Sequence, residues 1–311
     1  YEEYRARGLY PFFRAIETQS ATQRSYPPLP APTWQCVPGP VRQRVDTGGK
    51  KVVLVTDAEP QQANLRGMIE RFQGSLTPEA TAINLHDVDI KGGCLGCLKC
   101  GYDNECVYEG KDGFTDFYNS QLKPADMLVF AGAVRDRYLS ATWKTFFDRS
   151  FFNGHAPSLV GKQFAFLISG PLSQAADLRQ ILETWVQLQR CNLAGIVTDE
   201  GVDAAGLDGL LEQLAGRLVR CAEAGYRQPQ TFLGVAGTRL FRDEVYGPLR
   251  FVFQADHRAY KRLGVYDFPQ KDWRTRMANA VMTPLLRIPR FRQGFKTQIN
   301  PMMIRPYQKL F

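Results

Sequence analysis

The chain is poor in histidine and has no long apolar run. Only three histidines occur in 311 residues, and His86, His155 and His257 are too far apart to show metal-ligand spacing, so we assign none of them to catalysis. No apolar run approaches the roughly eighteen residues of a membrane span. The first residues also lack the charged-then-apolar order of a secretory signal. We expect a cytoplasmic protein without a membrane span.

The cysteine count argues against a disulfide framework. Seven cysteines are present, an odd number, and Cys36, Cys191 and Cys221 are scattered along the chain. This usage fits a reducing compartment, where thiolates stay available for metal. A chain of 311 residues with 44% hydrophobic content can bury a full core, so we expect one domain with extensions, or two domains.

Positive charge is concentrated at the end of the chain. Residues 237–311 hold fifteen Lys and Arg against five Asp and Glu, whereas residues 51–236 hold seventeen against twenty-two. Such asymmetry is typical of proteins that bind nucleic acid, a membrane surface or an acidic protein, and also of solvated or dimer-packing tails. The tail shows no recognised nucleic-acid motif. An acidic protein partner is the expectation that we retain.

Apolar runs alternate with helical periodicity through the middle of the chain. The expected strands are residues 51–56, 81–85, 127–134, 163–170 and 194–198. The expected helices are residues 64–72, 114–122, 141–152, 176–190 and 207–224. Parallel strands need crossovers, which are usually helices, so this alternation predicts an α/β fold with a doubly wound parallel sheet.

The chain therefore divides into three parts. Residues 1–50 contain a proline-rich stretch and are expected to form an arm or linker, and residues 51–236 form the α/β domain. Residues 237–311 form a basic, aromatic extension that is expected to be partly helical, with breaks at Pro284 and Pro289. We expect its aromatic side chains to pack against the core or a partner subunit.

Four cysteines lie within thirteen residues, in the segment GGCLGCLKCGYDNECVY. Cys94, Cys97 and Cys100 are separated by two residues each, and Cys106 follows five residues later. Four soft thiolate ligands held close together suit an iron-sulfur cluster or a structural zinc ion. The loop follows the second expected strand, so it lies at the carboxyl edge of the sheet, where ligands bind in such folds. The spacing predicts one self-contained metal site.

The α/β part resembles the flavodoxin-like NAD(P)H-dependent FMN reductases, and among them the iron-sulfur flavoproteins. Besides the cysteines, the resemblance rests on the segment SATWKTFFDR after the third strand, which is similar to the family's S-A-x-x-K-x-F-x-D-R helix. Within this helix we expect Asp148 and Arg149 to anchor the element by ion pairing. The resemblance covers residues 51–236.

This resemblance implies a five-stranded flavodoxin-like sheet of order 2-1-3-4-5, an FMN at the strand ends and a nearby 4Fe-4S cluster. It also implies NAD(P)H or ferredoxin as electron donor and a dimer or tetramer. No catalytic side chain is required, because cofactor positioning carries such reactions. By resemblance, the residues at the FMN would be Thr56, Asn64, Ala133, Val134, Arg135, Tyr138, Ser140, Ser169 and Gly170.

The phosphate loop departs from the family pattern. Asp57 and Glu59 place negative charge where a phosphate would bind, and Ala133 and Arg135 replace the family's proline and tyrosine. The sequence therefore allows two redox functions. One is an FMN- and cluster-dependent oxidoreductase, and the other is a non-enzymatic iron-sulfur carrier or redox sensor with a weakened flavin site. A zinc-filled scaffold that binds nucleic acid is the third alternative.

Overall fold

This computed structural model describes residues 13–14, 17–18, 34–135, 137–267 and 272–304. The chain divides into two compact units, Tyr1–Pro30 and Ala31–Phe311. All the elements named below belong to the second unit. Within the described ranges, no helix is long and apolar enough to cross a membrane.

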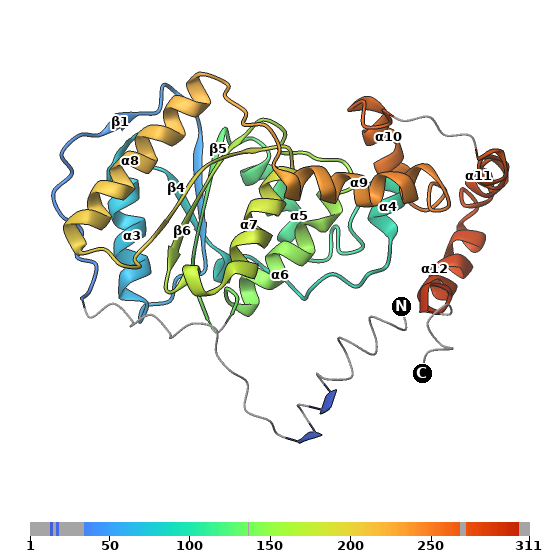
Figure 1. Cartoon of the computed structure of the whole chain (residues 1–311), viewed down its shortest axis with the longest axis horizontal. Helices are drawn as coiled ribbons and strands as arrows, with labels where there is room; N and C mark the ends of the chain where they lie inside the picture. Colours follow the sequence, from blue (N-terminus) through green and yellow to red (C-terminus); the bar gives the residue numbers. More distant parts are fainter. Residues whose placement is uncertain (1–12, 15–16, 19–33, 136, 268–271, 305–311) are drawn as a thin grey trace. The chain divides into compact units, whose positions relative to one another are not determined.

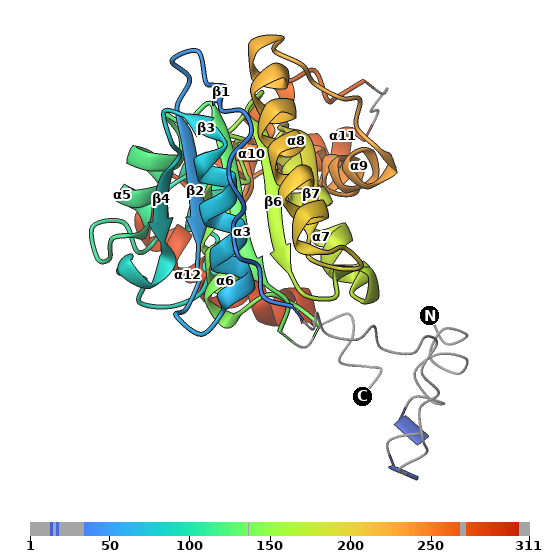
Figure 2. The ribbon, with the colours of Figure 1, turned by 90° about the vertical axis from the view of Figure 1, so that its left-hand side faces the viewer.

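A five-stranded parallel sheet forms the centre of the second unit (Figures 1 and 2). Its strands are β2 (Val52–Thr56), β4 (Thr81–Asn84), β5 (Met127–Ala133), β6 (Gln163–Ser169) and β7 (Asn192–Thr198). They lie in the order β4-β2-β5-β6-β7, and every pairing is parallel. Counted along the chain this is 2-1-3-4-5, so the predicted flavodoxin-like fold is confirmed.

Helices cover both faces of the sheet and bury two apolar clusters. The helices of the domain are α3 (Ala63–Gly74), α5 (Phe114–Phe117), α6 (Ala141–Ser150), α7 (Ala176–Leu188) and α8 (Ala204–Glu223). One cluster joins α3 and α8 to one face, and the other joins α5, α6 and α7 to the opposite face. Strand residues alternate between the clusters, as the two-residue period of a strand requires. All five residues of β2 are buried.

The other elements of this part are short, and those outside the predicted helices and strands are too short to show a period. They are β1 (Val45–Asp46), β3 (Leu76–Thr77), α4 (Lys99–Asp103), η2 (Leu85–Asp87), η3 (Tyr118–Leu122), η4 (Phe151–Asn153) and η5 (Leu172–Gln174). The strands β1 and β3 pair with each other in parallel, outside the main sheet. The element η3 continues α5 as a single π-helical turn, so the predicted helix over 114–122 is present but changes its winding.

Residues 34–44 run along helices of their own chain. The Cys36 amide donates to Asn64 Oδ1 over 2.9 Å, and the Gly39 amide donates to Asp208 Oδ2 over 2.9 Å. A Cβ atom at Gly67 would lie 2.3 Å from the Cys36 carbonyl oxygen, so only glycine allows this approach. This part of the predicted N-terminal arm therefore covers the start of α3. The rest of it lies outside the described residues.

The C-terminal extension is helical. Its helices are α9 (Phe232–Tyr246), α10 (Gln254–Arg262), α11 (Trp273–Leu285) and α12 (Pro289–Ile304). The chain breaks between α11 and α12, as predicted, but the two prolines act differently. Pro289 opens α12, where its missing N–H is not needed, whereas Pro284 lies in the last turn of α11. Of the aromatic side chains expected to pack against the core or a partner subunit, Phe268 lies outside the described residues.

His257 makes the stability of this extension depend on pH. Burial, together with Arg250, Lys261 and Arg258, lowers the pKa of His257 from 6.5 to about 4, and its Nδ1 lies 2.9 Å from the Tyr266 hydroxyl. Between pH 6.5 and 4 the His257 ring binds a proton in the unfolded state but not in the folded state. The free energy of unfolding therefore decreases as the pH is lowered through this window. We expect a loss of about 1 kcal/mol at pH 5 relative to pH 7, less than the full shift would give, because the half-buried ring is partly screened by water.

Hydrogen exchange of α10 at the two pH values, corrected for intrinsic exchange rates, measures this loss. His257→Gln should remove most of the pH dependence, whereas the matched substitution at the exposed His86 should leave it unchanged. Equal pH dependence in the His257 variant and the unmodified chain would refute the assignment.

Candidate functional site

The cysteine loop lies between η2 and α5, and one turn of helix holds its centre. Helix α4 carries Cys100 and is flanked by two residues in the left-handed region, Leu98 with φ 57° and Asn104 with φ 63°. Few side chains adopt this conformation without cost. The loop is therefore bent sharply on both sides of α4, and this bend brings the cysteines toward one another.

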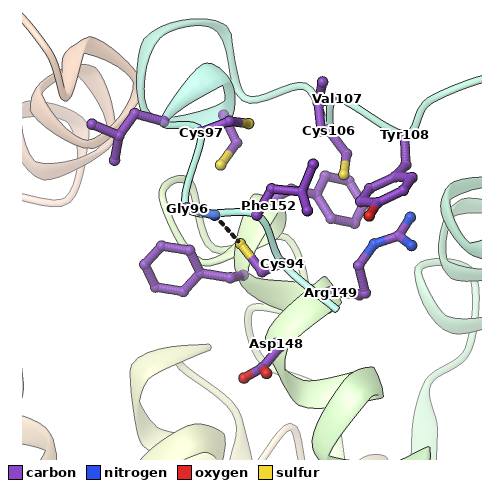
Figure 3. Close-up of a pocket in the computed structure, with 13 residues that line it drawn as sticks. Cys94, Gly96, Cys97, Cys106, Val107, Tyr108, Asp148, Arg149 and Phe152 are labelled. Atoms are coloured by element: carbon purple, nitrogen blue, oxygen red, sulfur yellow. Dashed lines mark hydrogen bonds between the residues drawn. The ribbon is translucent and has the colours of Figure 1, made fainter. Parts of the chain in front are cut away.

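All four cysteines line one small pocket (Figure 3). The pocket has a volume of about 40 Å³, and the rest of its lining is mainly apolar, with Phe152 and Val107 among its walls. Figure 3 shows Cys94, Cys97 and Cys106 around the same space. The Gly96 amide lies 3.5 Å from Cys94 Sγ and donates to it. The structure thus brings together the four residues that the sequence predicts as metal ligands.

The cysteines influence one another electrostatically. Burial, followed by the neighbouring Cys94, Cys97 and Cys106, raises the pKa of Cys100 to about 12. Across the described ranges, no three His, Cys, Asp or Glu side chains are arranged as a finished metal site. The thiols therefore share a pocket without yet having a metal-binding arrangement.

A buried arginine forms one wall of the pocket. The Arg149 side chain pairs with both carboxylate oxygens of Asp112, over 2.6 and 2.9 Å, and donates to the Gly92 carbonyl oxygen over 3.1 Å. Its guanidinium carbon lies 4.0 Å from the centre of the Tyr108 ring. Arg149 is only 1% exposed. The predicted anchoring role of Arg149 is therefore present, although its partner lies in the cysteine loop region and not on its own helix.

One donor of Arg149 remains unused. Its Nε is buried and has no hydrogen-bond partner among the described residues. Burial alone would lower the pKa of Arg149, but Asp112 and then the Cys106 sulfur raise it. Cys106 is thus close enough to interact with the guanidinium without meeting hydrogen-bond geometry. A buried donor without an acceptor is costly, and a negatively charged sulfur at this position would satisfy it.

The C-terminal extension packs against the cysteine loop. The Arg258 guanidinium donates to the Tyr102 carbonyl oxygen over 3.2 Å, and the Arg292 guanidinium lies 4.9 Å from the centre of the Tyr102 ring. Asp256 of α10 also forms a buried pair with His155, which follows η4, and its Oδ2 lies 2.8 Å from His155 Nδ1. These contacts tie α10 and α12 to the loop, so the extension is part of the environment of the pocket.

Gly101 sets how closely the extension approaches the loop. A Cβ atom at Gly101 would lie 2.8 Å from the Phe253 ring. We expect Gly101→Ala to push this ring away and to destabilise the protein by about 1–2 kcal/mol, the usual range for overpacking. Urea unfolding measures the change.

Gly209→Ala is the matched control for this substitution. Gly209 lies in α8 with nothing within 4 Å of a built Cβ atom, so alanine there should stabilise the helix by up to about 1 kcal/mol. A Gly101→Ala variant as stable as the Gly209→Ala variant would mean that the contact with Phe253 is not tight.

The residues predicted to bind FMN lie at the carboxyl ends of β2, β5 and β6, but their polar groups already have partners. Ser169 Oγ and the Gly170 amide donate to Asp199 over 2.8 and 2.7 Å, and the Val134 amide donates to the Ser169 carbonyl oxygen over 2.8 Å. Asn64 Nδ2 donates to Asp199 over 3.2 Å. The donors expected to face a flavin edge are therefore engaged within the chain.

Most of the remaining residues predicted to bind FMN also form hydrogen bonds within the chain. Arg135 and Tyr138 exchange backbone hydrogen bonds of 2.7 and 3.2 Å. Ser140 Oγ caps α6 by accepting from the Trp143 amide over 3.1 Å. Ala133 ends β5, and Thr56 Oγ1 accepts from the Ala58 amide over 3.0 Å.

The loop after β2 does not fit a phosphate as it is placed. Asp57 is buried and accepts from Trp143 Nε1 over 2.9 Å, and Glu59 pairs with Arg135 over 3.0 Å. The Glu59 amide donates to Gln62 Oε1 over 2.8 Å, so this donor is also used. No side chain caps the start of α3, so its first amides could donate to a phosphate, but the phosphate would also meet the carboxylates of Asp57 and Glu59. As placed, this loop does not fit the phosphate of FMN, because the two negative charges repel it.

Two residues at these strand ends are missing from the sequence predictions. Asp199 accepts hydrogen bonds from Asn64 in α3 and from the Gly170 amide after β6. Trp143 covers Gly132 so closely that a Cβ atom there would lie 2.7 Å from Trp143 Nε1. Asp199 directly follows the fifth strand, and the strand-end rule could have found it. Nothing in the sequence marks Trp143, because its role depends on contacts across 86 residues.

Comparisons with known proteins find similarity in structure only. No family model and no curated protein matches the chain. Among solved structures, RosB with a bound 8-demethyl-8-formylriboflavin-5'-phosphate intermediate is 13% identical, with a TM-score of 0.45, over 63% of this chain and 88% of that one. Azoreductase AzrA is 17% identical, with a TM-score of 0.38, over 57% and 99%.

A third similar structure is an FMN-dependent NADH-azoreductase from Bacillus anthracis str. Ames Ancestor in complex with FMN. It is 14% identical, with a TM-score of 0.41, over 55% of this chain and 99% of that one. These values are too low to carry an argument about function. The strand order and the two helical layers show that the chain has a flavodoxin-like α/β fold.

Proposed function

We propose that this protein is a redox protein that binds an iron-sulfur cluster through Cys94, Cys97, Cys100 and Cys106. The observation that supports the proposal most strongly is the pocket itself. Four cysteines line it, and a buried arginine donor that has no partner within the described part of the chain lies near one of them. Cysteine thiolates are the usual ligands of such clusters, and four of them suit a 4Fe-4S cluster. A structural zinc ion would use the same donors but would leave the protein redox-inactive.

The surrounding residues fit this role. Gly96 donates its amide to Cys94 Sγ, and hydrogen bonds to ligand sulfur are one of the means by which proteins adjust cluster potentials. Arg149 adds a permanent positive charge beside Cys106. Phe152 and Val107 add apolar walls to the pocket, whereas Cys94 is exposed to solvent. A bound cluster would supply one-electron transfer, and these residues would hold its ligands and shield it.

The proposal also names the chemical classes of electron donor and acceptor. NAD(P)H or ferredoxin is the proposed donor for an oxidoreductase of this fold, and a small molecule or protein is the proposed acceptor. A homo-oligomer would bring redox groups of neighbouring subunits together. Because the strand-end loop does not fit FMN, direct exchange with a one-electron protein partner such as ferredoxin is favoured over hydride transfer, which needs a two-electron acceptor.

An FMN-dependent oxidoreductase is the second candidate. It is favoured by the sheet order, since in such sheets ligands bind where the strand order reverses, here between β2 and β5. Binding there would require that the phosphate loop rearrange and that Asp57 and Glu59 be neutralised by basic groups.

Reversible reduction tests the proposal. Anaerobically purified protein should show a broad absorbance near roughly 400 nm that dithionite bleaches and air restores. A colourless protein that contains zinc would overturn it. Resolved bands near roughly 370 and 450 nm, with FMN released on denaturation, would instead favour the second candidate.

A further inference from the structure

Helix α11 has an apolar face that nothing in the described part of the chain covers. Trp273, Met277 and Val281 follow one another at intervals of four residues, so they lie on one side of the helix. They are 66%, 59% and 57% exposed. At 3.6 residues per turn, positions two apart point in nearly opposite directions. The buried Asn279, which donates to the Gly247 carbonyl oxygen over 2.7 Å, therefore marks the inner side of α11.

Two more exposed apolar residues follow along the chain, one between α11 and α12 and one in the first turn of α12. Ile288 and Phe291 are both exposed, and Pro284 lies between them and Val281 on the chain. We call the exposed residues Trp273, Met277, Val281, Ile288 and Phe291 the α11 face. Contiguous exposed apolar residues of this size are unusual in soluble domains and mark interaction sites.

Positive charge surrounds the α11 face. From residue 273 to 300 the chain has basic residues at positions 274, 276, 287, 290, 292 and 296, and it has no acidic residue. Arg274, Arg276, Arg287 and Arg290 are exposed. The partner of this face must therefore combine an apolar interior with a negatively charged surface.

We propose that the α11 face binds an anionic phospholipid surface. Interfacial membrane helices commonly carry tryptophan and other apolar residues on the side that enters the lipid, with arginine or lysine nearby, and α11 has both kinds of residue. Tryptophan prefers the boundary between headgroups and acyl chains, and each nearby basic residue adds attraction to anionic lipid. A second copy of this chain is a poorer occupant, because a symmetric contact would place the same arginines opposite each other.

Vesicle sedimentation of the full chain tests this inference independently of the cysteine site. We expect binding to vesicles of phosphatidylcholine with phosphatidylserine, little binding to phosphatidylcholine alone, and release at high salt because the charges are screened. Trp273→Ala should lower the partition coefficient about tenfold, as expected when a large apolar side chain no longer enters the bilayer. Replacing both Arg287 and Arg290 by glutamate should lower it at least as much.

Phe232→Ala is the matched control, since Phe232 is 82% exposed on α9, outside the α11 face. It should bind vesicles like the unmodified chain. Equal binding to both kinds of vesicle, no binding, or equal losses in the Trp273 and Phe232 variants would overturn the proposal. So would a dimer in light scattering that Trp273→Ala dissociates, because a second copy would then cover the face.

Discussion

Cys97→Ala is expected to abolish the iron-sulfur cluster. The four thiols line a single pocket. Cys97 is the middle one of the three cysteines that are separated by two residues each. Removing one of four ligands leaves an open coordination position, and cluster assembly at such a site fails. Iron and acid-labile sulfide per chain, determined after anaerobic purification, should both fall to near zero.

Cys221→Ala provides the control for this loss. Cys221 is a partly exposed free cysteine in α8, and it does not line the pocket. Its replacement should leave iron and sulfide unchanged. A full iron and sulfide complement in the Cys97 variant would show that the ligand assignment is wrong.

Arg149→Gln is expected to destabilise the protein strongly. The substitution removes the partner of Asp112, whose side chain is fully buried. Breaking a buried ion pair from one side typically costs about 3–5 kcal/mol, because the remaining charge is left uncompensated. Urea unfolding should show this loss, and iron content should fall with it because Arg149 also faces Cys106.

Lys144→Gln separates this effect from a general loss of charge in α6. Lys144 pairs with Asp148 on the same helix, over 2.5 and 2.6 Å, but both side chains are exposed to solvent. Exposed pairs of this kind contribute only about 0.5 kcal/mol. If Arg149→Gln does not fold, Arg149→Lys keeps the charge and should retain iron in part. Equal stability of the Lys144 and Arg149 variants would contradict the structural role of the buried pair.

Acid should weaken the ion pair between Asp112 and Arg149 and so lower the stability of the protein. Burial alone would raise the pKa of Asp112, but hydrogen bonds from Arg149 and from backbone amides hold it below the usual value. A carboxylate with a lowered folded pKa contributes stability above its unfolded pKa and loses it as pH falls through the folded value. This loss comes at lower pH than the His257 effect.

The sheet could be predicted from sequence because parallel strands buried on both faces appear as continuous apolar runs. Val52–Thr56 and Gln163–Ser169 are such runs, and both form strands within a residue of the expected bounds. The helices followed from their period in the same way. Elements of two to five residues, such as β1 and α4, show no period and were missed.

The cysteine pocket could be predicted from spacing alone, but its surroundings could not. Arg149 and Asp112 are 37 residues apart, and Gly101 and Phe253 are separated by more than half of the α/β domain's length. Contacts of this range depend on how the elements pack. The same limit applies to the strand-end loops. The sequence indicated that the negative charge of Asp57 would oppose a phosphate, but it could not predict the hydrogen bond between Asp57 and Trp143.

Iron and acid-labile sulfide analysis of the unmodified chain, purified without oxygen, tests the central claim most directly. The account predicts about four iron atoms and about four sulfides per chain, held by the four cysteines of the pocket. Zinc at one atom per chain without sulfide, or no metal with the four thiols free, would contradict it.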